Sequence, residues 1–127
     1  MAENRNTYTL KNDAGRGTVK VAEEVVAVIA GLAATEVKGV ASIAGGITGK
    51  ILARKGIKAL SRGVHVDVKD NAVTVDLVLE LDYGFSIPEV GAEVQEKVKS
   101  TIETMTGLQV ENVNISVADV AVDDGEQ

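Results

Sequence analysis

The amino-acid sequence predicts an α+β fold with two layers, in which a mixed β-sheet of about four to five strands has two helices packed on one face. One observation is the alternation of valine and leucine with polar residues over residues 64–82, which is typical of a hairpin with one buried face. Another is a pair of segments, residues 22–36 and 86–106, whose apolar residues recur with the helical period. The third is their order, because each helical segment lies between two strand-like segments. Helices on one face of a sheet bury both sets of apolar side chains together.

Length and composition suit a single soluble domain with an aliphatic core. The chain has 127 residues, of which 45% are hydrophobic but only 2% are aromatic, so valine, isoleucine, leucine and alanine must fill the core. There is no cysteine, which fits a reducing compartment. The N-terminal residues contain no apolar signal segment, and the longest apolar run, residues 25–34, is shorter than the roughly 20 residues of a membrane span. We therefore expect a cytoplasmic protein without a transmembrane segment.

Polarity divides the chain into three parts. Residues 1–17 are polar and aperiodic, and we expect a flexible N-terminal arm there. Residues 18–122 are expected to form one α+β domain, and residues 123–127 an acidic tail.

The first half of the domain reads as strand, helix and strand. Residues 18–21 are compatible with a short strand, and the helix that follows has two glutamates in its first turn, where the helix dipole favours acids. We expect its core-facing stripe to consist of Val21, Val25, Ile29 and Leu32. Gly39 predicts a turn, and residues 40–44 a short strand.

The central hairpin is the clearest local prediction. Asp70 and Asn71, which both tolerate positive φ, separate two alternating segments. A two-residue turn there pairs Val68 with Val73, Val66 with Val75, and Val64 with Leu77, all on one face.

The second helix has a signal at each end. Ser86 and Glu89 form a capping box, Pro88 lies in the first turn, and Gly107 suits the position after the last turn. The predicted apolar stripe is Ile87, Val90, Val94, Val98, Ile102 and Met105. A last strand over residues 111–120 is expected to bury Val113, Ile115 and Val117.

No catalytic, cofactor or metal site follows from the residues. The segment "GGITGK" resembles a phosphate-binding loop, but its first glycine is one residue too close to the Gly-Lys pair, and Ile51 stands where that loop needs Ser or Thr. The only histidine, His65, is expected to lie opposite Asp76 on the outer sheet face as a surface pair. An enzyme that used this pair would need a pocket around His65. Four acids alternate along the same face, and we interpret them as a row that keeps this face soluble and prevents sheet-to-sheet pairing: Asp67, Asp76, Glu80 and Asp82.

The run at residues 45–63 is the chemically unusual part of the chain. It contains five positive residues and no acid, and subtracting these five charges from the net charge of −6 leaves −11 for the remainder. The positive residues are Lys50, Arg54, Lys55, Lys58 and Arg62. A short amphipathic helix is predicted over residues 48–55, ended by Gly56. We take these five residues as a candidate partner-binding segment.

Several uses of the basic segment remain open. It suits an acidic protein surface, including that of another copy of the chain, or an anionic membrane surface. Nucleic acid is disfavoured, because the pI is about 4.8 and no aromatic residue interrupts the segment to stack on bases. A solvated connection without a partner is the alternative.

Three quoted segments support a family resemblance. "VKGVASI", "GVHVDVKDNAVTVDLVLELDYG" followed by "SIPEV", and "VENVNISVADV" resemble the alkaline shock protein and general stress protein family of Gram-positive bacteria, which respond to cell envelope stress. The resemblance runs from about residue 17 to 122. It implies a cytoplasmic α+β protein with a role in envelope homeostasis. Some members are held at the membrane by a partner membrane protein, and some self-associate. It implies no enzymatic activity and no cofactor, so no site residues are carried over.

We therefore expect a non-enzymatic binding or scaffold module near the inner membrane face, acting through protein partners and self-association. The alternative is a nucleic-acid or anionic-surface binder that uses the same basic segment.

Overall fold

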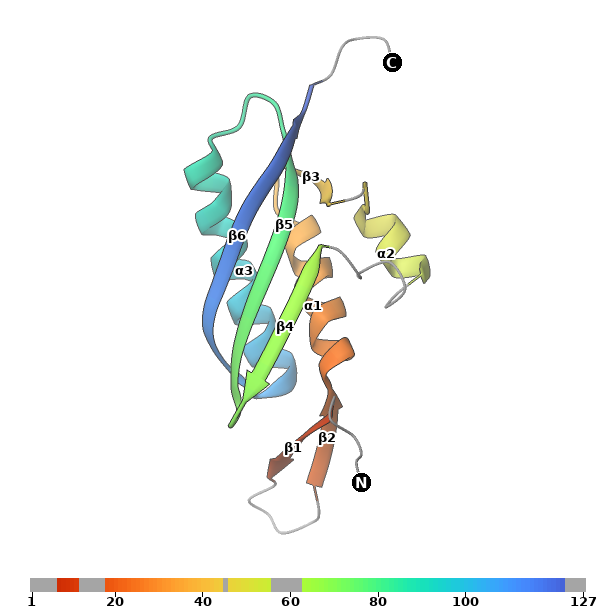
Figure 1. Cartoon of the computed structure of the whole chain (residues 1–127), viewed down its shortest axis with the longest axis vertical. Helices are drawn as coiled ribbons and strands as arrows, with labels where there is room; N and C mark the ends of the chain where they lie inside the picture. Colours follow the sequence, from red (N-terminus) through yellow and green to blue (C-terminus); the bar gives the residue numbers. More distant parts are fainter. Residues whose placement is uncertain (1–6, 12–17, 45, 56–62, 123–127) are drawn as a thin grey trace.

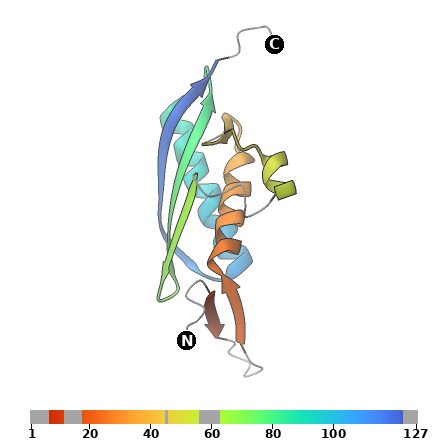
Figure 2. The ribbon, with the colours of Figure 1, turned by 45° about the vertical axis from the view of Figure 1, so that its right-hand side comes forward.

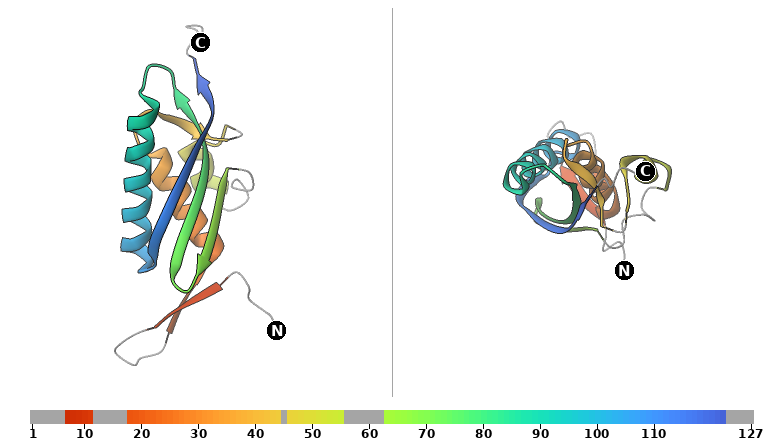
Figure 3. Two further views of the ribbon diagram at one scale, coloured as in Figure 1. Left: turned by 60° about the vertical axis from the view of Figure 1, so that its left-hand side comes forward. Right: turned by 90° about the horizontal axis from the view of Figure 1, so that it is seen from above.

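The computed structural model describes residues 7–11, 18–44, 46–55 and 63–122. The elements are β1 (Thr7–Lys11), β2 (Thr18–Ala22), α1 (Glu23–Thr35), β3 (Val40–Ile43), α2 (Gly49–Lys55), β4 (Val64–Lys69), β5 (Ala72–Asp82), α3 (Ile87–Thr106) and β6 (Gln109–Ala121). Strands β3 to β6 form a mixed sheet, and α1 and α3 lie side by side on one face of it (Figure 1). The views in Figure 2 and Figure 3 show the other face of the sheet without a covering helix. The predicted α+β class with two layers is confirmed, and α2 is a third, shorter helix.

Strand β5 is the centre of the sheet. One of its edges pairs along its whole length with β6, in parallel. Its other edge is shared, because β4 pairs antiparallel with residues 72–77 and β3 pairs antiparallel with residues 79–81. Backbone hydrogen bonds from Val78 N to Gly63 O and from Ala44 N to Val78 O join the ends of β4 and β3. The sheet is therefore three strands wide, with β6 alone along one side.

The predicted hairpin register is confirmed. Val68 lies opposite Val73, Val66 opposite Val75, and Val64 opposite Leu77. Asp70 and Asn71 have φ values of 53° and 68°, as a turn that matches the strand twist requires. These six apolar residues are buried, whereas the alternating residues of β4 are exposed. One face of the hairpin thus belongs to the core and the other faces water.

The predicted core-facing stripe of α1 is confirmed at Ile29 and in part at Val21 and Leu32, which pack half-buried against the core, and it is wrong at Val25. Val25 is 46% exposed and Leu32 only half-buried, and the buried residues are instead Val26, Ile29, Ala30, Ala33 and Ala34. Nearly the whole helix is apolar, so its period did not select one face. The alanines face inward because small side chains let α1 approach α3 and the sheet closely.

Both predicted ends of α3 are confirmed. Ser86 Oγ accepts a hydrogen bond of 3.4 Å from Glu89 N, and Gly107 ends the helix with a left-handed φ of 79°. The middle of the predicted stripe is buried, but Ile87 and Met105 at its ends are 48% and 66% exposed. The buried positions of α3 recur every four residues and end at Thr106, so Met105, one residue earlier, points away from the core rather than past its end.

Strand β6 is less buried than expected. Val113, Ile115 and Val117 are half-buried rather than buried, although Val110 is fully in the core. The reason is topological, because β6 is an edge strand and α3 covers only part of it.

The N-terminal arm contains a strand, which corrects the expectation for residues 7–11. β1 pairs antiparallel with β2 as a separate two-stranded ribbon, so the predicted strand at residues 18–21 exists but does not join the main sheet (Figure 1). The rest of the expected arm, residues 1–6 and 12–17, and the expected acidic tail, residues 123–127, lie outside the described residues.

Candidate functional site

Helix α2 holds the described part of the basic segment. After β3, the chain turns so that Ile43 and Ile47 exchange two backbone hydrogen bonds of 2.7 and 3.0 Å. Thr48 Oγ1 then accepts a bond of 3.3 Å from Ile51 N, which satisfies a free N–H of the first turn. At Gly49 a Cβ atom would lie 3.1 Å from Thr35 Oγ1, so the start of α2 approaches the end of α1 closely. The predicted short helix is confirmed.

Two of the five candidate residues are brought together on this helix. Lys50 and Arg54 are one turn apart, and both side chains are exposed while Ile51 is half-buried. Neither makes an ion pair with any described residue. Both cations are therefore available to a partner.

The remaining candidates are placed less completely. Lys55 is the last residue of α2, whereas Lys58 and Arg62 lie outside the described residues. Helix α2 lies beside α1, on the side away from α3 (Figure 3). A partner that binds Lys50 and Arg54 would thus approach the flank of the helical layer rather than the open sheet face.

The pair of His65 and Asp76 lies where the register predicts. The two residues are opposite each other on the outer face, and both are exposed. Asp76 Oδ1 accepts a hydrogen bond of 2.8 Å from Asn114 Nδ2, which links β5 to β6. Three cavities are lined by described residues alone, and His65 lines none of these three. The enzyme hypothesis gains no support from this geometry.

The acidic row and the glycine-rich segment show no ligand geometry either. Glu80 Oε1 accepts a bond of 2.9 Å from Ser42 Oγ, so one member of the row ties β5 to β3. Within the described ranges there is no group of three or more His, Cys, Asp or Glu residues arranged to hold a metal ion. Lys50, the lysine of "GGITGK", lies within α2 and is exposed.

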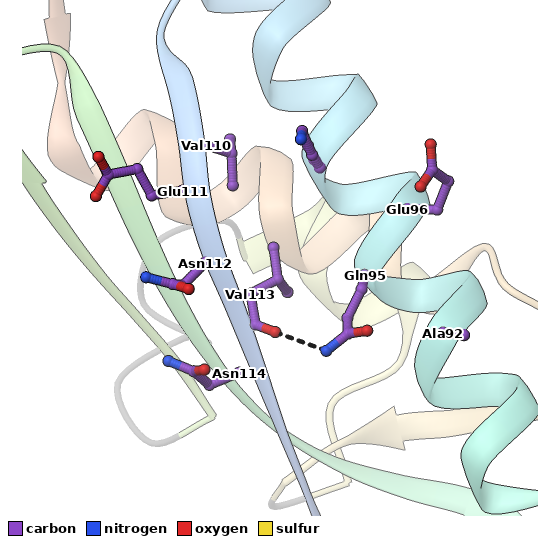
Figure 4. A pocket seen from close by; sticks show the side chains of 9 residues that line it. Ala92, Gln95, Glu96, Val110, Glu111, Asn112, Val113 and Asn114 are labelled. Carbon is purple, nitrogen blue, oxygen red and sulfur yellow. Dashed lines mark hydrogen bonds between the residues drawn. The ribbon is translucent and has the colours of Figure 1, made fainter.

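A groove beside β6 was not predicted. A cavity of about 480 Å³ lies between α3 and β6, lined by both elements (Figure 4). Gln95 crosses it, and its Nε2 donates a hydrogen bond of 2.9 Å to the carbonyl oxygen of Val113. No local sequence signal indicates this feature, because it depends on the position of β6 at the edge of the sheet.

None of the helices in the described part of the chain combines the length and the apolar character that crossing a bilayer demands.

Comparisons with known proteins agree with the motifs. Residues 11–122 match the model of the alkaline shock protein family, which is described as having a cell envelope-related function. The uncharacterized protein YqhY of Bacillus subtilis is 39% identical over 111 residues, which cover 87% of this chain and 82% of that protein. The uncharacterized protein YloU of the same organism is 36% identical over 84% of this chain and 90% of its own length.

One relative has a name that refers to stress. The stress response regulator gls24 homolog of Streptococcus pyogenes is 28% identical over 91% of this chain, which spans 65% of that protein. Among solved structures, the C-terminal domain of MamM matches 76% of this chain and 95% of its own length at 16% identity and a TM-score of 0.47, which is too distant to support a statement about function. The chain belongs to the alkaline shock protein family of cell envelope-related function, the family that its sequence motifs indicated.

Proposed function

We propose that the protein is a non-enzymatic binding or scaffold module that works at the inner face of the cell membrane, through a protein partner and through association between its own copies. The observation that carries the proposal is the exposed cationic surface of α2. Lys50 and Arg54 lie side by side without an ion-pair partner in the described part of the chain, on a protein whose net charge is −6. The envelope-related role of the family supports a partner at the membrane.

The charge distribution suggests how such a partner would be recognised. An exposed pair of cations adds little binding energy by itself, because water and salt screen it. It does speed and orient the encounter with an acidic surface, and it repels other cationic surfaces. The acidic remainder of the chain would at the same time be repelled by anionic lipids, so a membrane protein is a better partner for α2 than the lipid surface.

Charge reversal on α2 tests the proposal. In cells, the double variant Lys50→Glu/Arg54→Glu should lose membrane association by roughly tenfold or more, because the steering attraction becomes repulsion. The measurement is the fraction of the protein that sediments with the membranes. The matched control is Lys38→Glu/Lys69→Glu, which makes the same change in net charge at two exposed lysines outside the basic segment.

The nature of the partner is tested with purified protein. Binding to membranes that is abolished by prior protease treatment indicates a protein partner, whereas binding to protein-free phosphatidylglycerol vesicles indicates an anionic surface. A mobility shift of DNA or RNA at low salt that disappears steeply as salt rises would favour the nucleic-acid alternative. An unchanged membrane fraction in the α2 variant would refute the proposed use of this surface.

A further inference from the structure

The side of β6 that faces away from β5 is an open sheet edge. In the described part of the chain, β6 pairs with β5 alone. The carbonyl group of Val113 points to the open side, since it accepts its hydrogen bond from Gln95 of α3 (Figure 4). Alternate residues of a strand turn their N–H and C=O groups to the same edge, so Ile115 and Val117 present theirs there too. The edge offers a row of backbone donors and acceptors to a further strand.

Two of the outer strands, β4 and β6, differ in how they discourage such pairing. Strand β4 has 6 residues, and its exposed side chains are His65, Asp67 and Lys69. Short length and charge are features by which proteins prevent edge-to-edge association. Strand β6 has 13 residues, and its span 112–118 contains no charge and no proline. The β4 edge is therefore protected by its length and charge, whereas the middle of β6 has neither feature and carries the Gln95 contact at Val113.

The surroundings leave room for an added strand. The cavity of about 480 Å³ separates α3 from this edge, and the Gln95 side chain of α3 crosses it to reach Val113. The flank of α3 that lines the cavity has one acid, Glu96, and one base, Lys99. The same flank of a second copy would also carry one acid and one base. Two such flanks brought close together would therefore not face each other with charges of one sign only.

We infer that this edge joins two copies of the chain, through antiparallel pairing of β6 with β6 of a second copy about a two-fold axis at Ile115. The inference rests on the self-association included in the proposed function, and it names the surface. In this register Ile115 lies opposite its own counterpart, and Val113 lies opposite Val117 of the second copy. All three edge-facing residues thus find partners, as a two-fold interface requires. The Val113 carbonyl, which already accepts from Gln95, would use its second lone pair for the added strand.

The side chains in this register are compatible with pairing. Asn114 lies opposite Ser116 of the second copy, so no like charges oppose each other within the uncharged span. Glu111 lies opposite Asp119 at either end, where these like charges oppose pairing and register shifts also interrupt the ladder with β5. The pairing is therefore confined to the regular middle of β6.

Removal of one edge N–H tests the inference directly. Ile115→Pro deletes the N–H on the open edge and leaves the bonds between β5 and β6 in place, because those come from the neighbouring residues. Sedimentation velocity over a concentration series should show a dimer for the wild-type chain and a monomer for this variant. The control Ile115→Thr keeps the N–H and the β-branched shape, and it should remain a dimer.

A charge pair tests the register without changing the backbone. Asn114→Lys/Ser116→Lys places lysine opposite lysine twice and should raise the dissociation constant of the dimer by roughly tenfold or more. Asn114→Lys/Ser116→Glu places lysine opposite glutamate and should restore the dimer. Because both variants lose the same bond between Asn114 and Asp76, their difference reports on the sign of the charge at position 116. Circular dichroism checks that each variant is folded.

Two outcomes would overturn the inference in distinguishable ways. A dimer that persists in both Ile115→Pro and the double-lysine variant would mean that copies associate through another surface, and self-association itself would stand. A wild-type chain that stays monomeric throughout the series would remove self-association from the proposed function as well. Neither result would affect the membrane-partner test on α2, because that test depends on a different surface.

Discussion

At the residue scale, two glycines show how local space decides the effect of one methyl group. Gly63 lies between the strands that share an edge of β5, and a Cβ atom there would clash with Ile43 Cγ2 and lie 3.2 Å from Ala44 N. Gly91 lies within α3, where a Cβ atom would meet nothing within 4 Å. The same substitution should therefore have opposite effects at the two positions.

Gly63→Ala should lower the free energy of unfolding by about 1–3 kcal/mol, since Ile43 or the backbone must move. Gly91→Ala should raise it by about 0.5–1 kcal/mol, because alanine restricts the unfolded chain and favours the helix. Urea denaturation of both variants measures the two changes. A stabilised Gly63→Ala variant would contradict the close approach of β3 and β4 at this point.

At the element scale, α3 shows that an apolar residue placed on the apolar side by the helical period is not always buried. Ile102 and Met105 both belong to the apolar stripe in the sequence, but Ile102 is fully buried and Met105 is 66% exposed. The helical period allows either Met105 or Thr106 to follow Ile102 on the apolar side, and the packing of α3 in the fold buries Thr106. The distinction can be measured by truncating each side chain.

We expect Ile102→Ala to lower the free energy of unfolding by about 2–5 kcal/mol, because it leaves a cavity in the core. Met105→Ala should change it by no more than about 0.5 kcal/mol, as for other surface positions. Thermal or urea unfolding gives both values. Equal losses for the two variants would show that the Met105 side chain is covered in solution.

At the scale of the whole molecule, stability should fall outward from β5. Both edges of β5 are paired, and α1 and α3 lie over the sheet. The amide groups of β5 are therefore expected to exchange with solvent only on global unfolding. The ribbon of β1 and β2 is a separate two-stranded sheet, a form that is marginally stable alone. Hydrogen exchange followed by NMR should find the slowest amides in β5 and much faster ones in β1. Comparable protection of the ribbon and β5 would contradict this order.

Sequence reasoning was accurate where neighbouring residues supply the physical cause. The pair Asp70 and Asn71 fixes the turn, and the turn fixes the register of every residue across β4 and β5. Ser86 and Gly107 satisfy free backbone groups within one turn of themselves, so the limits of α3 were also readable. For the candidate site, the helical conformation and exposure of Lys50 and Arg54 were foreseen from the local pattern.

Errors arose where the cause lies far along the chain. The face of α1 could not be chosen, because almost every residue of that helix is apolar and only its contacts with α3 and the sheet select the alanine-rich side. The strand at residues 7–11 was missed, since nothing local marks it and its partner is β2. The edge position of β6, and hence its groove, follows from how three strands divide the two edges of β5.

By itself, then, the sequence determined the fold class, the hairpin and its register, the ends of α3, the family and the opposite charge of the basic segment. These depend on turns, caps, composition and periods, which act over a few residues. Only the tertiary structure decided which strand has a free edge and which apolar residues remain exposed. Those properties depend on which elements meet, and a sheet has edges only after its strands have been placed in order.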